Sequence, residues 1–293
     1  MKNAGVLIVF VCVMAAVNFA SANTIRGIDI DFVTIGNAGN TADTGGTVGC
    51  GAVGYNYRIG KYEVTNTQWN TFTAAIGAPT GYDGGYSYSA GFTGVQQPTN
   101  NVSWHEAAQF CNYLTSGDKS KGAYQFSGDN TNPGNFLGID RASSISTYGT
   151  TYVIPTEDEW YKAAYFKSDA SGYSLYANGT DIAPTDVQSN YGHDDDTLWN
   201  VGTGTQEQNG TSDMMGNAWE WNETLFDSSY RILRGGACSH DDNYLNSLHR
   251  YDEDDNYPYY EDVIVGFRVA EIPEPATICL LGIGALSLIR RKK

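Results

Sequence analysis

Basic side chains, histidine and cysteine are scarce in this 293-residue sequence. It holds 17 Lys and Arg against 33 Asp and Glu, with four His and five Cys. Five of the cationic side chains lie at the two ends, so residues 23–275 carry 33 acidic and 12 basic groups, a net charge of −21. Such a surface repels nucleic acid and anionic lipid, which excludes both as partners. It suits cations, including calcium, or a soluble exported protein.

The sequence also lacks internal repeats and linkers. No period of 20 to 50 residues recurs, which excludes a solenoid or a propeller. Only 17% of residues are charged, whereas there are 34 Gly and 21 Tyr, a composition typical of a loop-rich globular domain held by aromatic packing. No Pro/Ser-rich stretch divides the body of the chain, so we expect a single α+β domain.

The first 22 residues have the pattern of a secretory signal peptide. Lys2 provides the positive start, GVLIVFVCVMAAV the apolar core, and Ala20-Ser21-Ala22 a cleavage site. Cys12 would leave with this peptide. The protein is therefore predicted to be exported into a compartment that permits disulfides.

Residues 272–293 form a second targeting segment. An apolar run, ATICLLGIGALSLI, is short for a membrane span, and the basic cluster RRKK after it is expected to stay on the cytoplasmic side. The preceding PEPAT, the run and the basic end together resemble the PEP-CTERM sorting signal of Gram-negative bacteria. The resemblance implies transient membrane anchoring, processing by an exosortase, and delivery to the cell surface or extracellular matrix.

Local patterns predict few regular elements between these ends. YRIGKYEVT (57–65) alternates like a strand, and NTQWNTFTAAIG is predicted to be a helix with Asn66 or Thr67 as N-cap. SWHEAAQFCNYLTSG has a capping box of Ser103 and Glu106, and IPTEDEWYKAAYF has another of Thr156 and Glu159. We expect the last strand over residues 263–272, and long polar loops elsewhere.

Six motifs follow one another in the order of a known family: IGKYEVTNTQWNTF, PTNNVSWHEAAQFCNYL, YVIPTEDEWYKAAYF, SDMMGNAWEWNETL, RILRGGA and VGFRVA. Together they resemble the formylglycine-generating enzyme, or sulfatase-modifying factor, family over residues 55–271, with 23–54 as an N-terminal extension of the domain. The resemblance implies an irregular, loop-rich α+β fold related to C-type lectins. The tryptophans are expected to pack in its core.

The family's copper chemistry needs two cysteine thiols shortly after the RGG-type motif. Alignment on Gly235 and Gly236 places His240 and Leu245 where these thiols would stand, and Cys238 lies two positions before the first. Leucine can neither bind a metal nor exchange disulfides. A shifted site of Cys238 and His240 is the remaining catalytic candidate.

A related branch uses iron held by a His-x3-His-x-Glu run. The four histidines, His105, His193, His240 and His249, form no such run, so copper and iron are both disfavoured as cofactors. His105, in the first turn of a capped helix, is predicted to be a solvated surface residue.

Calcium is the cofactor that the resemblance favours, because the GNxWEW segment of the family forms part of a calcium site. Here Asp213 and Glu220 would provide side-chain oxygens and Gly216 and Ala218 backbone carbonyls, all hard ligands suited to Ca²⁺. A second calcium site would involve Asn190, Tyr191 and one aspartate of 194–196, with Asp196 as the candidate. The alternative is that Asp213 and Glu220 only stabilise turns.

Two features of the remaining sequence stay open. The segment YDEDDNYPYYED (251–262) is either a solvated loop or a surface whose tyrosines and carboxylates bind a carbohydrate or a protein. The three mature cysteines allow one pair, Cys50 with Cys111, Cys50 with Cys238, or Cys111 with Cys238, or none.

Two functions are consistent with these residues. The first is an exported, surface-sorted family member that lacks the thiol pair and serves as a calcium-stabilised binding or structural module of the envelope or matrix. The second is a metal-dependent oxidoreductase with altered chemistry that involves Cys238, His240 or His249.

Overall fold

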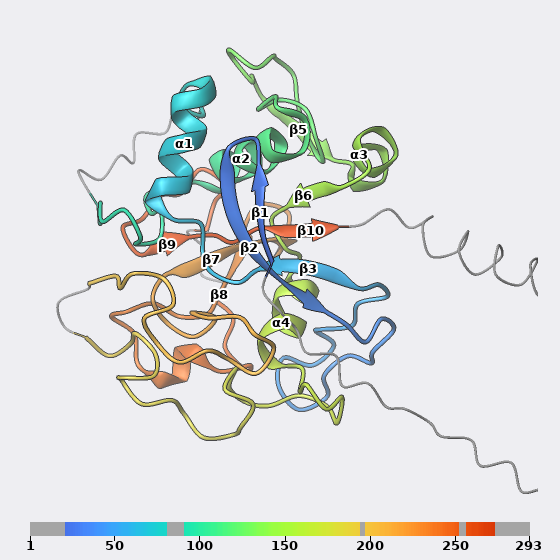
Figure 1. Ribbon diagram of the computed structural model, residues 1–293. Coiled ribbons are helices and arrows are strands. Elements are labelled where there is room, and N and C mark those ends of the chain that lie inside the picture. Colours follow the sequence, from blue (N-terminus) through green and yellow to red (C-terminus); the bar gives the residue numbers. More distant parts are fainter. Residues whose placement is uncertain (1–20, 81–90, 194–196, 252–255, 273–293) are drawn as a thin grey trace, which may run out of the picture.

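The computed structural model describes residues 21–80, 91–193, 197–251 and 256–272. In this part of the chain, helices and strands alternate with long loops in an α+β arrangement (Figure 1). Most of the predicted signal peptide and of the predicted sorting segment lies outside the described residues, but Ser21 and Ala22 belong to strand β1 (Ser21–Ile25). Within the described part, no helix is long and apolar enough to cross a membrane.

The helices begin where side-chain caps satisfy their first backbone N–H groups. Helices α2 (Trp104–Ser116) and α4 (Glu157–Tyr165) carry the predicted capping boxes, and α2 ends at Gly117 as predicted. Helix α1 (Asn66–Ile76) is capped by Thr65, so the prediction of Asn66 or Thr67 was wrong. The Asn66 amide instead donates to the Phe92 and Gly94 carbonyls. Helix α3 (Arg141–Tyr148), which starts after the cap Asp140, was missed because RASSISTY has only one aliphatic residue larger than alanine.

A five-stranded antiparallel sheet with the order β1-β2-β3-β10-β6 brings the two ends of the domain together. It contains β1 (Ser21–Ile25), β2 (Ile28–Ile35), β3 (Tyr57–Gly60), β6 (Thr151–Val153) and β10 (Ala270–Ile272). Ala270 pairs with Ile59 on one side and Val153 on the other, so the last strand lies between earlier ones. The hairpin of β1 and β2 extends this sheet, as Figure 1 shows.

Two smaller sheets carry the rest of the strands. β7 (Trp219–Leu225) lies between β8 (Arg231–Arg234) and β9 (Val265–Gly266), and β4 (Tyr124–Phe126) pairs with β5 (Phe136–Ile139). The prediction of one strand over 263–272 was wrong. β9 runs parallel to β7, whereas β10 belongs to the five-stranded sheet, so the chain changes sheets between them.

Aromatic side chains fill the core. Trp104, Trp160 and Trp221 are completely buried, as predicted. The Trp104 indole donates to the Asn222 carbonyl at 3.1 Å and the Trp221 indole to the Val102 carbonyl at 2.8 Å. These bonds tie α2 and the segment before it to β7, so each large apolar group also fixes a polar contact between loops.

His105 is not the solvated residue that its position in the first turn of α2 predicted. Its ring centroid lies 5.4 Å from that of Phe136 and 6.5 Å from that of Phe126. Burial, aided by the charge of Arg231, lowers the pKa of His105 to about 4. The strands β4 and β5 cover this end of the helix, which the helical pattern alone did not reveal.

Candidate functional site

A tight turn follows strand β8 at the paired glycines. Gly235 and Gly236 have φ angles of +102° and +78°, a region that favours glycine. A Cβ on Gly236 would lie 2.7 Å from the Leu245 side chain. The turn leads to Cys238 and to a short 3₁₀ helix (Asp242–Leu245), and this segment is the corner that the sequence singled out.

Cys238 is sealed within this corner. It is completely buried in a small apolar cluster with Leu198 and Ala218, against which Phe92 and Ile264 pack. Its backbone N–H donates to the Asn217 carbonyl at 3.0 Å. Cys50 and Cys111 are also buried, and none of the three forms a disulfide within the described residues. A buried thiol in apolar surroundings is not placed for metal binding or exchange with solvent.

Leu245 occupies the interior beside the glycine turn. It is fully buried, and its carbonyl accepts a hydrogen bond from the Tyr165 hydroxyl at 3.0 Å. Leu245 therefore has a packing role at this position.

Cys238 and His240 lie in different environments. Cys238 is buried in the apolar cluster, whereas His240 is half-buried among aromatic side chains.

The imidazoles of His240 and His249 both lie next to the indole of Trp219 and the phenol of Tyr244. The Trp219 centroid lies 5.3 Å from the ring of His240 and 5.7 Å from that of His249. Tyr244 approaches both imidazoles, with centroid separations of 4.6 Å from His240 and 4.4 Å from His249. Tyr251 packs on Trp219 at 5.0 Å. His249 and Trp219 are the members of this cluster that sequence reasoning did not combine, since they are 30 positions apart.

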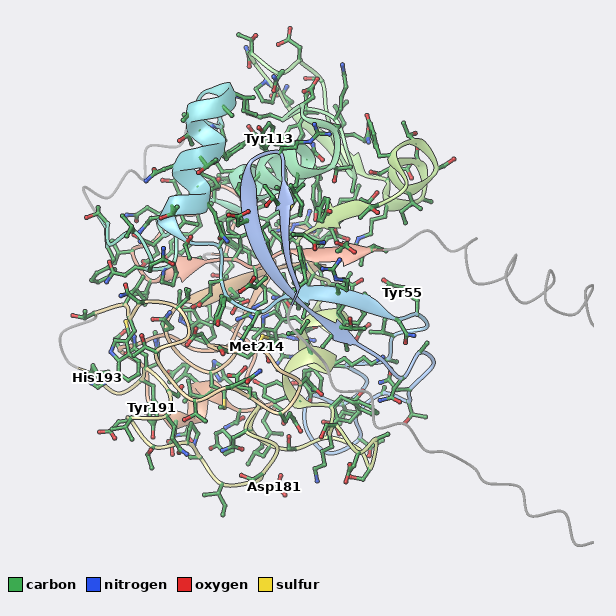
Figure 2. All side chains as sticks on the ribbon, in the orientation of Figure 1. Tyr55, Tyr113, Asp181, Tyr191, His193 and Met214 are labelled. Carbon is green, nitrogen blue, oxygen red and sulfur yellow. The ribbon has the colours of Figure 1, made fainter. Side chains whose placement is uncertain are left out.

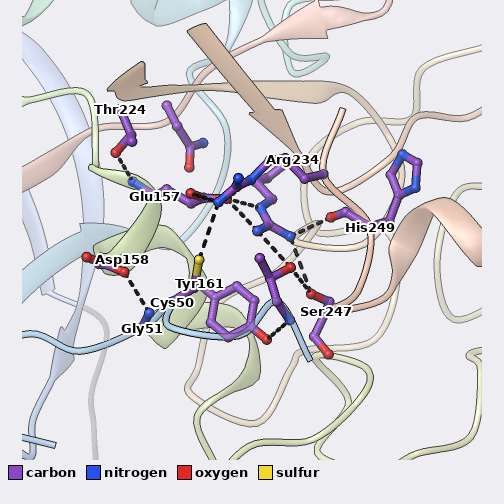
Figure 3. Close-up of polar contacts among 12 residues, drawn as sticks. Cys50, Gly51, Glu157, Asp158, Tyr161, Thr224, Arg234, Ser247 and His249 are labelled. Atoms are coloured by element: carbon purple, nitrogen blue, oxygen red, sulfur yellow. Dashed lines mark hydrogen bonds and ion pairs between the residues drawn. The ribbon is translucent and has the colours of Figure 1, made fainter. Parts of the chain in front are cut away.

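An ionic network centred on Glu157 and Arg234 lies next to the glycine turn (Figure 3). The Glu157 carboxylate accepts from Arg234 and from Arg250, whose Nε–Oε1 distances are 2.9 and 2.8 Å. Arg234 also donates to the His249 carbonyl. Burial by itself would raise the pKa of Glu157, but the charges of Arg234 and Arg250 outweigh it and lower the pKa. No local pattern predicted this pairing, because the partners lie on different elements.

Cys50 lies at the edge of this network. Its sulfur is 3.5 Å from Arg250 Nη2. Burial first, and then the charge of Glu157, raise the pKa of the Cys50 thiol despite the nearby arginines. The thiol form is therefore favoured, which makes Cys50 a packed residue of the network.

The first predicted calcium set does not fit the observed contacts. Both Glu220 oxygens accept from Arg268, with Nε–Oε2 and Nη2–Oε1 distances of 2.6 Å, and the Trp160 indole donates to Oε2 at 2.8 Å. Asp213 Oδ2 accepts from the Gly202 N–H at 2.6 Å. Calcium at Glu220 would have to displace a fully buried guanidinium. Gly216 and Ala218 lie on the same turn, and the calcium assignment there stays a prediction.

The second predicted set fits better where it is described. Asn190 is 1% exposed, and its Oδ1 has no hydrogen-bond partner in the described segments, while its Nδ2 donates to Asn217 Oδ1 at 2.9 Å. A buried oxygen of this kind suits a hard cation. The Tyr191 hydroxyl donates to the Pro184 carbonyl at 2.5 Å, and Figure 2 places Tyr191 close to His193. Asp196 lies outside the described residues. Within the described residues, no three His, Cys, Asp or Glu side chains are grouped so that they could hold a metal ion.

Tyrosines gather at the end of the acidic segment. The rings of Tyr257 and Tyr259 are stacked, with centroids 5.0 Å apart and an interplanar angle of 8°. Tyr230 adds a third ring 4.6 Å from Tyr257, and their hydroxyls are 3.0 Å apart. Residues 252–255 of the predicted binding segment are outside the described residues. The described part forms a half-buried aromatic surface next to strand β8.

The profile of the sulfatase-modifying factor enzyme 1-like domain matches residues 51–272, about three quarters of the chain. The chain belongs to the sulfatase-modifying factor family. A second match, to the PEP-CTERM protein-sorting motif, covers residues 271–293 and indicates an exported, surface-sorted family member. Both resemblances seen in the sequence are thus confirmed.

Known members differ in the functions that their names give. This chain is 28% identical to the chaperone protein LppX of Paenibacillus barcinonensis over 207 residues, which cover 62% of this chain and 69% of LppX. It is 25% identical to hercynine oxygenase of Mycobacterium tuberculosis over 240 residues, 73% of this chain. The match spans about half (52%) of that oxygenase.

The fold is that of solved family structures. Variable protein 1 of Treponema denticola superposes with a TM-score of 0.58 at 20% sequence identity, over 87% of this chain and 99% of that structure. This confirms the predicted irregular α+β fold related to C-type lectins.

Proposed function

We propose that this family member is a binding module of the cell envelope or extracellular matrix rather than a thiol-dependent oxidase. One observation supports the proposal: the segment that follows the glycine pair offers no pair of accessible thiols. Cys238 is sealed in an apolar cluster, and the completely buried Leu245 packs beside the glycine turn. The family's copper chemistry uses two thiolates, and a hydrocarbon side chain cannot replace either of them.

The ligand surface in this proposal is the aromatic face beside β8. Tyr230, Tyr257 and Tyr259 present partly exposed rings. Asp262 of the same segment accepts hydrogen bonds from the Tyr260 hydroxyl and the Ile264 N–H. Rings with hydroxyl groups suit sugar faces and peptide groups alike. The proposed partners are therefore a carbohydrate or protein ligand at the cell surface of a Gram-negative bacterium, and an exosortase that processes the C-terminal segment after transient membrane anchoring.

The proposal is tested by incubating the purified full-length protein with copper, oxygen, a reductant and a peptide that contains a sulfatase motif. Mass spectrometry should find no aldehyde on the peptide cysteine. The matched variant His240→Cys/Leu245→Cys places thiols at the two aligned positions. It serves as the control for whether the missing thiols alone account for the lack of activity. Formylglycine produced by the unaltered protein would refute the proposal.

A second candidate function is a metal-dependent oxidoreductase of altered chemistry. The two imidazoles of His240 and His249 on either side of Tyr244 favour it, and the similarity to hercynine oxygenase supports it. Metal analysis of protein purified without chelator separates the two functions. Stoichiometric iron or copper that is lost in His240→Ala, or in Cys238→Ala, would support the enzyme, whereas calcium alone would support the module.

Calcium remains part of the proposed module, at the second predicted set. Asn190 Oδ1 and neighbouring oxygens of that loop would hold the cation, whose role would be to stabilise the loops. The contacts of Glu220 with Arg268 count against the first set.

A further inference from the structure

A polar groove lies between the β1–β2 hairpin and the start of α1, on elements other than those of the glycine corner. Its volume is about 430 Å³, in the range of small-molecule sites. Four separate segments of the chain form its walls, around residues 27–31, 62–71, 96 and 201. The lining residues that matter here are Asp29, Asp31, Tyr62, Gln68, Thr71 and Gln96.

Hydrogen bonds hold the walls in place. Gln68 links α1 to β2, because its Nε2 donates to the Asp29 carbonyl at 2.6 Å while its Oε1 accepts from the Thr65 N–H at 2.8 Å. The Val201 N–H donates to the Gln96 carbonyl at 2.9 Å, which joins the other two segments. A groove with fixed walls loses little conformational entropy when a ligand enters.

Two carboxylates give the groove its charge. Asp29 and Asp31 are two residues apart on β2, so they share the solvent-facing side of that strand, and neither forms an ion pair within the described residues. Lys61 brings one cation to the groove, because its Nζ lies 5.1 Å from the ring centroid of Tyr62, which lines the groove. Two carboxylates against this one ammonium leave the groove with a net negative charge. The groove therefore repels anions and attracts a positive group.

A small cavity continues the groove inward. It has room for roughly one water molecule, about 10 Å³, and shares Asp31, Tyr62 and Gln68 with the groove. Glu63, which is 1% exposed, lines it, and Glu63 Oε2 has no hydrogen-bond partner within the described chain. The other oxygen of this carboxyl, Glu63 Oε1, accepts from the Asn217 amide at 3.0 Å.

The remaining groups suit a ligand that is rich in hydroxyls. The Gln96 amide and the Tyr62 hydroxyl make no hydrogen bond within the described residues, and Thr71 Oγ1, which donates to the Thr67 carbonyl, can still accept. Carboxylates, an amide and hydroxyls are the groups that bind sugar hydroxyls.

We propose that this groove binds a saccharide that carries amino groups, with an ammonium group at Asp29 and Asp31 and hydroxyls at Gln96 and Tyr62. The site is separate from the aromatic face proposed above, so either can fail without the other.

The test is isothermal titration of the purified full-length protein with a glucosamine tetramer at about 20 mM salt, where charge contacts are weakly screened. Asp29→Asn/Asp31→Asn keeps the shape of both side chains and should weaken binding at least about tenfold. The matched control Asp186→Asn alters an exposed carboxylate outside the groove and should leave the affinity unchanged. Thermal melts verify that all variants fold.

Two further ligands make the test specific. The N-acetylated tetramer keeps the hydroxyls but loses the ammonium groups, and it should bind at least about tenfold more weakly. Tetralysine keeps the charge without the hydroxyls, and Gln96→Ala should weaken the glucosamine tetramer but not tetralysine. The proposal is overturned if the glucosamine tetramer does not bind, if the double variant binds it equally well, or if tetralysine binds as tightly.

Discussion

Two of the buried arginine networks in the described part of the molecule have opposite charge balances. Arg268 is paired with Glu220, but Glu63, Glu207 and Asp213 also lie in its field. Burial raises the pKa of Glu207 to about 8 and that of Asp213 to about 6. Acidic groups therefore outnumber basic ones around Arg268, and some of them retain protons at neutral pH.

In the other network, basic groups are in excess. Glu157 is shared by Arg234, which is fully buried, and Arg250, which is half-buried, and its pKa is lowered. In these two networks the carboxyl pKa values therefore shift in opposite directions, upward for Glu207 and Asp213 and downward for Glu157. The acidic network supports the turn before β7, and the basic one supports the glycine corner.

Removal of Arg268 should have the largest effect. Arg268→Met leaves the Glu220 carboxylate buried without its counter-charge and should lower the free energy of unfolding by about 3–5 kcal/mol. Urea denaturation monitored by tryptophan fluorescence measures it. The double variant Glu220→Gln/Arg268→Met removes both charges and should recover at least half of the loss. A single variant within about 1 kcal/mol of the unaltered protein would show that the pair is not the centre of its network.

Glu157→Gln should be the next in size. It leaves two guanidinium groups with one neutral amide and should cost about 2–4 kcal/mol of unfolding free energy. Arg250→Met is the matched control, because the partly exposed Arg250 should contribute only about 1 kcal/mol. Equal losses in the two variants would mean that burial of Arg234 does not set the strength of this network.

The pH dependence of stability separates the networks by sign. Because the folded pKa of Glu207 is raised from 4.5 to about 8, its contribution is fully present below about 4.5 and is lost as the pH rises to 8. The unfolding free energy should therefore fall by at least about 1 kcal/mol between pH 5 and pH 8.5.

Glu207→Gln should flatten that decline. The lowered pKa of Glu157 acts in the other direction, since its contribution is present above the unfolded pKa and is lost in acid. Urea denaturation at several pH values measures both effects in one series. A decline that persists unchanged in Glu207→Gln would assign the pH dependence to other groups.

Calcium should give the smallest effect. With a dissociation constant typical of extracellular sites, about 10⁻⁴ M, calcium at about 1 mM would stabilise the fold by about 1.4 kcal/mol, which scanning calorimetry detects. The gain should disappear in Asn190→Ala and persist in Glu220→Gln, measured against each variant's own calcium-free melt. The reverse result would mean that calcium displaces Arg268 from Glu220.

The sequence predicted the elements whose signals are local. The capping boxes of Ser103 with Glu106 and of Thr156 with Glu159 lie within four residues, so they fixed the starts of α2 and α4. The strand over 263–272 was not divided, because β9 and β10 pair with strands that are distant in the sequence. The β1–β2 hairpin was also missed, although its two strands are adjacent in the sequence.

For the candidate site, alignment on the glycine pair identified the positions of His240 and Leu245 but not their surroundings. Burial of Cys238 beside Leu198 and Ala218 brings together three segments separated by 20 to 40 residues. No local pattern encodes such a contact. The pairing of His249 with Trp219 was missed for the same reason.

The sequence by itself determined the family, the C-terminal sorting motif, the starts of α2 and α4 and the residues at the two aligned thiol positions, because motif order and capping are properties of adjacent residues. Only the tertiary structure decided that Glu220 pairs with Arg268, that Cys238 is buried and that Asp29 and Asp31 line a groove. These depend on which side chains lose water together, and long-range packing alone sets that.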